Sequence, residues 1–420
     1  MESTTCILCS SDICSILSLG DQAYVNTYLE HSSVSKPLAH PLELCVCTNP
    51  RCRHLQLSHL ASPVELFSHY LWVTGTAQTS QDYASNIAQK ILLAHKDALT
   101  IVEIASNDGT FLRPFIGFGL EVLGIEPAEN IADRANSEGI PTIMEFFGQH
   151  TVERIKSYFG REPDIILARN VIPHTPTPKE MVAEISRLAG SETSIFIEIH
   201  CFEAIESELQ YDSIYHEHYS YFSAFTLINL FQEFGLHPVS VERTEISGGS
   251  LLFQFRHKRP YDTISAEIRS LIKKSELLHQ PDRINSFAER CHAHTKSLRD
   301  TFMNVKKRYP DVPIYSYGSS ARGNTIITYA GLSKYIDACI DSSPLKWGTV
   351  NANTGLPIIA MSQIDASIDF VLYLAAWNFK EEILRILNEH NLHPKAILQP
   401  FPGHPRMHEE IPPANEISLC

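Results

Sequence analysis

A short stretch near the middle of the chain is dense in side chains that can move protons near neutral pH. It extends from Tyr211 to Phe222 and contains the run Tyr215-His216-Glu217-His218-Tyr219. An imidazole has an unperturbed pKa of about 6.5, which makes histidine the natural general base at physiological pH. We therefore expect this stretch to carry proton-transfer chemistry. A second zinc site, or histidines hydrogen-bonded within a polar core, is the alternative interpretation.

Cysteines near the start of the chain form two close pairs. Cys6 and Cys9 are separated by two residues, and Cys47 and Cys52 by four. Two such pairs of thiolates are typical of a tetrahedral zinc site that serves as a structural clip. Cys45 competes with Cys47 for one ligand position, and the shorter spacing to Cys52 favours Cys47. The alternative is that these residues are small buried apolar side chains.

The elements that must position this chemistry begin with an apolar, β-branched strand over Leu99–Ala105, followed by a polar turn, Ser106–Thr110, and a helical pattern. Strand, tight turn and helix form the first unit of a doubly wound parallel sheet. The further strands that we predict for this sheet are Val122–Glu126, Asp164–Ala168 and Ser194–Ile199.

The turn after the first strand distinguishes between two cofactor classes. A dinucleotide site requires Gly-x-Gly-x-x-Gly, whereas this turn holds one glycine, Gly109, and begins with an acid, Glu103. Glu126 lies 23 residues after Glu103 and is placed to accept hydrogen bonds from both hydroxyls of a ribose. Glu103 or Asp108 can face the amino group or the sulfonium of S-adenosylmethionine. The alternative is a solvated carboxylate at position 126 and a simple connecting turn.

Two later features favour S-adenosylmethionine over NAD. Residues 237–242 and 250–255 predict an antiparallel hairpin at the edge of the sheet, which is typical of class I methyltransferases. The aromatic pair Phe146-Phe147 lies between the predicted strands Val122–Glu126 and Asp164–Ala168 and can cover an adenine ring. The sequence therefore predicts an α/β fold with a class I, Rossmann-like methyltransferase sheet.

The chain resembles the nucleotide-sugar C-methyltransferases, which methylate carbon 3, or in some members carbon 5, of a TDP-linked 4-keto-6-deoxyhexose. The resemblance covers roughly residues 6 to 400 and includes the paired N-terminal cysteines. The other matching stretches are Val102–Gly109, Gly124–Ala128, Ile214–Phe222, Gly248–Ser250 and Tyr317–Asn324.

The resemblance implies that His218 is the general base, with Tyr215 and Glu217 beside it, in an enzyme of branched deoxysugar synthesis. A hydrogen next to a ketone is acidic only because the enolate spreads charge onto oxygen, so the site needs a base and an oxyanion donor. Tyr215 can supply the donor, and Glu217 can orient an imidazole. The predicted cofactor-binding residues are Glu103, Ala105, Asn107, Asp108, Gly109, Glu126, Pro127, Phe146, Phe147 and Asn170.

The sequence departs from this family pattern at three points. Ala105 stands where such loops often have glycine, the second cysteine pair has four residues between its members, and Ser247 stands where histidine is expected. The first two leave the class of enzyme unchanged, and the third leaves the details of the substrate open.

The C-terminal half predicts two helices over residues 262–308 and then a second α/β unit. Its strand Val312–Tyr317 leads into the loop Gly318–Asn324, a helix, and a strand Ile336–Asp341. Small residues at a helix start form an anion cradle, to which Arg322 adds a forked donor, although the loop can also be a simple helix cap. The residues that we predict for the diphosphate of a sugar nucleotide are Ser319, Ser320, Arg322, Asn324, Lys346, Trp377 and Asn378.

We thus predict a zinc-binding domain over 1–60, a methyltransferase domain over 61–258, a helical connector over 259–309 and a Rossmann-like sugar-nucleotide domain over 310–410. The net charge of −14 disfavours binding to nucleic acid or an anionic membrane, and no apolar run approaches the roughly 20 residues of a spanning helix. We expect a cytoplasmic monomer that takes a nucleotide sugar as its partner. The alternatives are an O-methyltransferase acting on a sugar hydroxyl and a non-enzymatic, zinc-containing binding protein.

Overall fold

The computed structural model describes residues 4–30 and 37–409 and contains two compact units. The first unit holds the chain through Cys14, then Cys45–Ala204 and Glu217–Gln280. The second holds Ser15–Leu44, Ile205–His216 and the chain from Pro281 onward. The units therefore cross the four ranges predicted from the sequence, and the division passes between His216 and Glu217.

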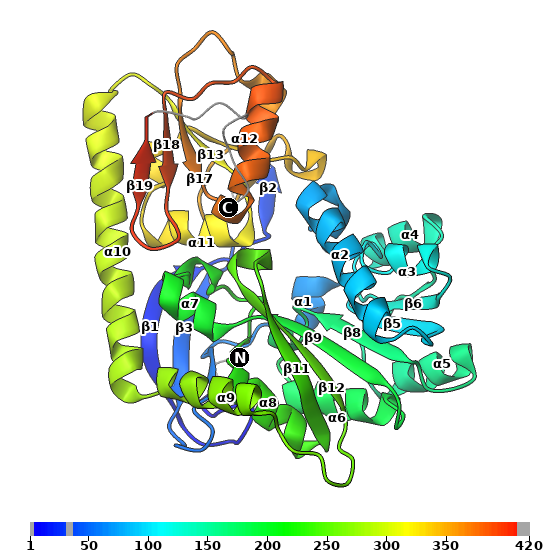
Figure 1. Cartoon of the computed structure of the whole chain (residues 1–420). Coiled ribbons are helices and arrows are strands. Elements are labelled where there is room, and N and C mark those ends of the chain that lie inside the picture. The colour runs from blue at the N-terminus through cyan, green and yellow to red at the C-terminus, as the bar shows by residue number, and fades with distance from the viewer. Residues whose placement is uncertain (1–3, 31–36, 410–420) are drawn as a thin grey trace. The chain divides into compact units, whose positions relative to one another are not determined.

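The first unit is built on a seven-stranded sheet with the order β11-β12-β9-β8-β5-β6-β7 (Figure 1). Its strands are β5 (Thr100–Ile104), β6 (Glu121–Ile125), β7 (Thr142–Ile143), β8 (Ile165–Arg169), β9 (Ser194–His200), β11 (Leu236–Thr244) and β12 (Ser250–His257). All are parallel except β12, which pairs antiparallel with both β9 and β11. The predicted class I methyltransferase sheet, including its antiparallel hairpin, is confirmed.

Helices cover both faces of this sheet because its central strands are apolar on both sides. On β5, Ile101 packs with α2 (Gln78–Ala94) and α3 (Arg113–Gly117). Val102 and Ile104 point the other way, into a cluster that includes residues of α5 (Gln149–Phe159), α6 (Pro178–Leu188) and α8 (Ala224–Glu233). The remaining helical elements of the central region are α1 (Pro63–Phe67), η1 (Thr74–Thr76), α4 (Glu129–Ser137), η2 (Ile172–His174), α7 (Phe202–Glu208), η3 (Tyr211–Ser213), η4 (Ile246–Gly248) and α9 (Ala266–Leu278).

A short strand pair joins the cysteine-rich segment to the histidine-rich stretch. β4 (Leu55–Leu57) pairs antiparallel with β10 (Ser220–Tyr221). The Leu57 amide also donates to the Tyr219 carbonyl, at 3.1 Å. β4 begins three residues after Cys52 and β10 begins two residues after His218. The proposed base is therefore followed directly by a strand that is held by the zinc-binding segment.

The second unit contains the second α/β sheet, with the order β16-β14-β13-β17-β18-β19. Its strands are β13 (Ile314–Tyr317), β14 (Ala338–Ile340), β16 (Ile358–Ile359), β17 (Val371–Leu374), β18 (Ala396–Gln399) and β19 (Arg406–His408), of which β19 alone is antiparallel to its neighbour. Its helical elements are α10 (Pro281–Arg308), α11 (Ala321–Tyr329), η5 (Ser333–Tyr335), η6 (Pro344–Lys346), η7 (Met361–Gln363), η8 (Trp377–Phe379) and α12 (Lys380–Glu389). A second α/β domain, as predicted, is confirmed.

An N-terminal segment belongs to this second unit. β2 (Tyr28–Glu30) pairs antiparallel with β15 (Thr349–Asn351), and β1 (Ile13–Gln22) lies beside β3 (His40–Cys47). The side chain of Asn353 donates to the Ala23 carbonyl and accepts from the Ala23 amide. Such pairing between residues some 330 positions apart has no signature in the local sequence.

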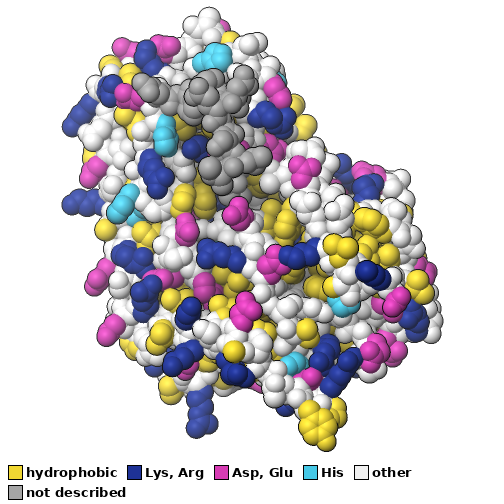
Figure 2. Space-filling model, viewed as in Figure 1, with side chains coloured by type: hydrophobic (Ala, Val, Ile, Leu, Met, Phe, Trp, Pro, Cys, Tyr) yellow, Lys and Arg dark blue, Asp and Glu magenta, His cyan; other side chains and the backbone are white. Residues whose placement is uncertain are grey.

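The surface mixes charges of both signs. On the viewed face, Lys and Arg side chains are interspersed with Asp and Glu (Figure 2). Among the helices of the described residues, none has the combined length and hydropathy needed to cross a membrane.

Candidate active site and zinc centre

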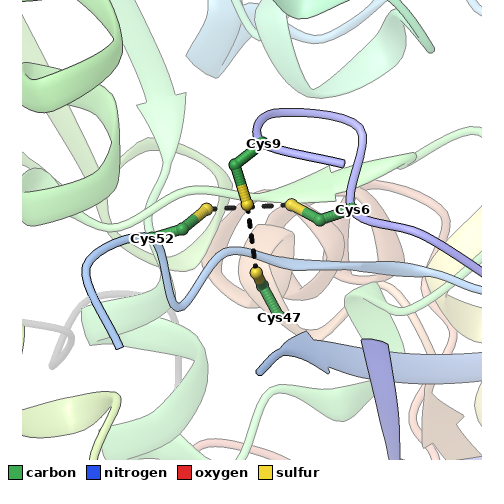
Figure 3. Close-up of side chains that lie close together, drawn as sticks. All are labelled: Cys6, Cys9, Cys47 and Cys52. Carbon is green, nitrogen blue, oxygen red and sulfur yellow. Dashed lines mark hydrogen bonds between the residues drawn. The ribbon is translucent and has the colours of Figure 1, made fainter. Parts of the chain in front are cut away.

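The four predicted zinc ligands lie together. The sulfur atoms of Cys6, Cys9, Cys47 and Cys52 all lie within 4.8 Å of one another, and their side chains point toward a common centre (Figure 3). Cys45, on the same strand as Cys47, is outside the cluster. The structure thus resolves the choice between the two cysteines in favour of Cys47, as predicted. Four thiolate donors form the ligand set of a closed, structural zinc site.

The thiols of this cluster contact one another in pairs, Cys6 with Cys52 at 3.7 Å and Cys9 with Cys47 at 3.4 Å. A hydrogen bond from the Cys52 side chain is the main cause that lowers the pKa of Cys6 to about 5, against the opposing effect of burial. Burial raises the pKa of Cys47 to about 12, and the shared hydrogen bond with Cys6 raises that of Cys52. Zinc binding requires all four sulfurs as thiolates, so it releases protons and weakens as the pH falls.

The turn Ser106–Thr110 after β5, which we call the cofactor loop, is organised around Glu126. This carboxylate is 5% exposed and accepts hydrogen bonds from the backbone amides of Asn107, at 3.0 Å, and Ala128, at 2.9 Å. Two carboxylate oxygens have about four acceptor positions, so two stay available for ribose hydroxyls. Burial raises the pKa of Glu126 to about 6, and the two amide hydrogen bonds oppose that rise.

Close packing restricts the residue types in this loop. Gly109 has a φ of +73°, and a side chain there would meet Ile140 at 2.5 Å. On the neighbouring strand β6, a side chain at Gly124 would collide with the Ser106 hydroxyl of this loop. Ala105 has a φ of 56°, a left-handed conformation that glycine adopts at lower cost.

The two acids proposed to face the cation of the cofactor differ in their partners. Both oxygens of Asp108 are engaged: Oδ2 accepts from the Gly75 amide and Oδ1 from Thr110. Glu103 is 2% exposed, and its Oε2 has no hydrogen-bond partner among the described residues. Burial, followed by repulsion from neighbouring carboxylates, raises the pKa of Glu103 well above its usual value despite attraction from Arg169. Glu103 is thus the acid with the greater need for a cationic ligand.

Replacing Glu126 with glutamine is expected to weaken S-adenosylmethionine binding by about 10- to 100-fold, because hydrogen bonds to a charged acceptor are lost. In the native protein the affinity should fall as the pH drops below about 6, where Glu126 takes up a proton and binding must displace it. Calorimetric titration between pH 5 and 7.5 measures both effects. Glu121→Gln, an exposed change at the start of β6, the strand that leads to Glu126, is the control. Unaltered affinity in the Glu126 variant would contradict the assignment.

A segment that sequence reasoning missed lies over this loop. The Asn107 side chain donates to the Trp72 carbonyl and accepts from the Thr74 amide. Tyr70 forms two backbone hydrogen bonds with the side chain of Asn130, on α4. Its hydroxyl donates to Glu217 Oε2 at 3.0 Å. The segment Tyr70–Thr74 therefore contacts the cofactor loop, α4 and Glu217 of the histidine-rich stretch, and its isolated position in the sequence gave no signal of this.

His218 is the partly exposed member of a buried stretch. Every other residue from Leu209 to Ile228 is buried. Residues 215–217 form a bend and turn rather than a strand, so side chains here do not alternate between two faces. The His218 ring packs edge-on against His174, with ring centroids 4.7 Å apart, and lies 6.1 Å from Tyr221. A half-buried imidazole is suited to exchange a proton with a ligand.

His174 is the second residue that sequence reasoning missed. It ends η2, which follows β8, and the neighbouring Pro173 carbonyl accepts from the Tyr219 amide at 2.8 Å. Burial lowers the pKa of His174 to about 4, against the effect of a hydrogen bond with the Glu217 backbone. The ring is therefore neutral at physiological pH, and it does not oppose protonation of His218. The loop after β8 lies at the same edge of the sheet as the cofactor loop, because β5 and β8 are parallel.

The remaining predicted residues occupy varied environments. Asn170 has a left-handed φ of 48°, and its Oδ1 accepts from the His200 amide. Phe146 is exposed, whereas Phe147 packs against the core. Pro127 and Asn378 are half-buried and Tyr215 is buried. Across the described ranges, the four cysteines are the one group of three or more ligands close enough to hold a metal ion, so the histidine-rich stretch lacks the ligands of a second zinc site.

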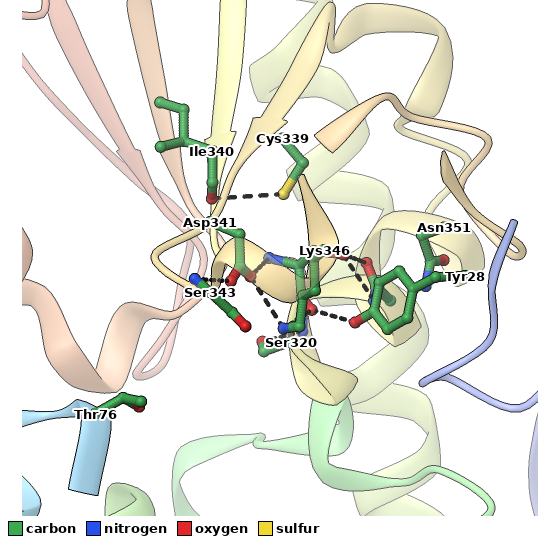
Figure 4. A network of polar contacts seen from close by, with 12 residues as sticks. Tyr28, Thr76, Ser320, Cys339, Ile340, Asp341, Ser343, Lys346 and Asn351 are labelled. Carbon is green, nitrogen blue, oxygen red and sulfur yellow. Dashed lines mark hydrogen bonds and ion pairs between the residues drawn. The ribbon is translucent and has the colours of Figure 1, made fainter. Parts of the chain in front are cut away.

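The predicted diphosphate residues of the second unit have partners within the protein. Lys346 is 7% exposed and donates to Asp341 Oδ2 and to the Ser319 carbonyl, where the Tyr28 hydroxyl also donates (Figure 4). Ser320 caps α11 by accepting from the Gly323 amide. The Asn324 side chain bonds Ser319 and the Val25 carbonyl, and Arg322 and Trp377 both contact Asp212. Binding of a diphosphate by this set stays a prediction.

Family comparisons agree with this architecture. Three family models match the chain in order, described as "Putative zinc binding domain" over residues 6–67, methyltransferase domain over 76–241 and C-methyltransferase C-terminal domain over 245–402. The C-methyltransferase NovU of Streptomyces niveus is 27% identical over 349 residues, which cover 82% of each chain.

Solved structures resemble part of the chain. Magnesium protoporphyrin IX methyltransferase ChlM from Synechocystis PCC 6803, with bound S-adenosylmethionine, is 12% identical with a TM-score of 0.32, and the match covers 42% of this chain and 79% of that chain. The PH0226 protein of Pyrococcus horikoshii OT3 is 12% identical with a TM-score of 0.37, covering 48% and 100%.

Proposed function

We propose that this chain, an S-adenosylmethionine-dependent C-methyltransferase with a zinc-binding domain, methylates carbon 3, next to the ketone, of a TDP-linked 4-keto-6-deoxyhexose. The observation that carries the proposal is the placement of His218. Its partly exposed ring packs against His174, which lies in the loop after β8, at the same sheet edge as the cofactor loop. Tyr70 is hydrogen-bonded both to Glu217, the residue next to His218, and to α4, the helix that follows Glu126.

The residues of this site have distinct roles in the proposed reaction. His218 accepts the proton from the carbon next to the ketone, and Tyr215 donates a hydrogen bond to the enolate oxygen that develops. Glu217, which accepts from the Tyr70 hydroxyl, holds the segment that carries the base. Neutral His174 supports the ring of His218 without repelling the proton that it takes up. A base in this position typically contributes about 10²–10⁴-fold.

The cofactor pocket supports the same chemistry. Glu126 would hold the ribose, Glu103 would face the cationic end, and Phe146 and Phe147 would lie against the adenine. Bound S-adenosylmethionine supplies a methyl group on a positively charged sulfur. Fixing the nucleophilic carbon near that methyl lowers the barrier mainly through proximity.

The position of the new methyl group tests this proposal. The protein is incubated with TDP-4-keto-6-deoxyglucose and S-adenosylmethionine labelled with ¹³C in the methyl group, and the product is analysed by NMR. We expect a C-methyl signal that correlates with the ketone carbon through two or three bonds. An O-methyl signal, or the absence of product from this sugar class, would contradict the proposed reaction.

A further inference from the structure

We propose that the Asp212 carboxylate occupies the position in the second α/β unit where an anionic ligand would bind. Arg322 and Trp377 bind this carboxylate, and they thereby act as positioning residues that hold the segment carrying Tyr215. The first step in the argument is the hydrogen bonding of Arg322. Its Nε donates to Asp212 Oδ2 at 2.9 Å, and its Nη2 donates to Asp212 Oδ1 at 2.8 Å. This two-point pairing is the geometry by which an arginine recognises an anion. The same Nη2 also donates to Gln210 Oε1, at 3.1 Å.

Trp377 completes the binding of Asp212. Its indole Nε1 donates to Asp212 Oδ2 at 2.8 Å, and its ring lies 4.8 Å from the guanidinium carbon of Arg322. The Asp212 side chain is 0% exposed and the Arg322 side chain 13%. A buried carboxylate with one forked cation and one indole donor is fully satisfied, so no charge of Arg322 is left over for a second anion.

Arg322 and Trp377 both lie where a doubly wound sheet usually binds its ligand. Arg322 lies in the first turn of α11, directly after β13, and Trp377 lies in η8, after β17. These strands are parallel, so both donors stand at the carboxyl edge of the sheet, where ligands bind in doubly wound folds. The anion that this edge holds is a carboxylate of the chain itself. Another acid at this edge, Asp341, is likewise paired, with Lys346 (Figure 4).

The segment around Asp212 is fixed at a second point. The Tyr211 hydroxyl contacts His294 Nδ1 and Thr295 Oγ1, each at 2.8 Å, on α10. Tyr215 lies three residues beyond Asp212 in the same unit. The two anchors therefore restrict the backbone from which Tyr215 projects. The role of Tyr215 in this inference rests on the proposed function. The clamp, by which we mean the contacts of Arg322 and Trp377 with Asp212, rests on the observed contacts alone.

The clamp and a diphosphate role for Arg322 predict different kinetics. If Arg322 acts as a clamp, Asp212→Asn and Arg322→Gln should each lower kcat by about 10- to 100-fold with KM for the nucleotide sugar changed less than about threefold, because a misplaced reacting group reduces turnover rather than binding. On a free-energy scale, the loss of kcat in the double variant should be smaller than the sum of the losses in the two single variants. The reason is that the neutral pair leaves no buried charge without its partner. If Arg322 instead binds a diphosphate, Arg322→Gln would mainly raise KM, and removing Asp212 would not reproduce the effect.

A second measurement keeps the clamp testable independently of the reaction. Backbone amide exchange over residues 210–216, followed by mass spectrometry, should be faster in Asp212→Asn than in the native protein, while S-adenosylmethionine affinity stays the same. Trp377→Phe, which removes one hydrogen bond and keeps an aromatic ring, should show a smaller increase. Arg385→Gln, which breaks the exposed ion pair with Glu389, is the matched control and should show none.

The two measurements separate the two possible failures. Unchanged exchange over residues 210–216 in Asp212→Asn, or a kinetic effect confined to KM, would overturn the clamp. A native protein that gives no product from the ketosugar, yet shows faster exchange in Asp212→Asn, would overturn the proposed substrate and leave the clamp standing.

Discussion

Replacing His218 with asparagine is expected to lower kcat for methyl transfer by about 10²–10⁴-fold, the usual contribution of a general base. Asparagine retains the size and a hydrogen-bonding group of the imidazole but cannot accept a proton from carbon. The buried neighbours of His218, including Tyr219 and Ser220, keep their own hydrogen bonds to the Ala61 carbonyl and to His54. We therefore expect the fold and the affinity for S-adenosylmethionine to be preserved.

Deuterium exchange isolates the proton-transfer step. In heavy water and without a methyl donor, the native protein should exchange the hydrogen on the carbon beside the ketone, and His218→Asn should not. His150→Asn, an exposed change on α5, should exchange at the native rate. Exchange and methylation at native rates in His218→Asn would refute the assignment of the base.

Loss of zinc is expected to have the second large effect. Cys47→Ser should bind zinc weakly, unfold at a lower temperature and lose most methyl transfer, because structural zinc sites contribute directly to the stability of the segments that they join. The affected segment leads into β4, whose partner β10 begins two residues after His218. We therefore expect removal of the metal to loosen the strand that follows His218, the proposed base.

Two buried histidines extend this connection. The imidazole of His54 bonds the Ser220 hydroxyl at 3.0 Å, and that of His279 bonds both the Arg53 carbonyl and the Ser223 hydroxyl. Burial lowers the pKa of His54 to about 3 and that of His279 to about 4, so both rings are neutral links. Both join the loop after Cys52 to the residues around β10.

Elemental analysis, thermal unfolding and turnover measure the consequence of zinc loss. Chelation of the native protein should reproduce the Cys47→Ser defect, and added zinc should reverse it in the native protein only. Cys14→Ser, an exposed cysteine outside the cluster, serves as the control and should retain zinc and activity. A zinc-free Cys47→Ser protein with native turnover would show that the clip does not support the active site.

The sequence by itself determined the features that depend on local pattern. Apolar, β-branched runs predicted β5, β6, β8 and β9, and the turn after β5 with its single glycine predicted a methyltransferase rather than a dinucleotide site. The cysteine spacing predicted the zinc ligands. These features are set by neighbouring residues, so a linear pattern contains them.

The tertiary structure alone decided which distant residues meet. Tyr70 and His174 join the active site across more than 40 residues, the N-terminal strand β2 belongs to the second unit, and Arg322 faces Asp212 rather than solvent. Periodicity and spacing report which face of an element is buried, but they carry no information about its partner. Partners are selected by the free energy of packing and charge pairing between segments that come together only in the folded chain.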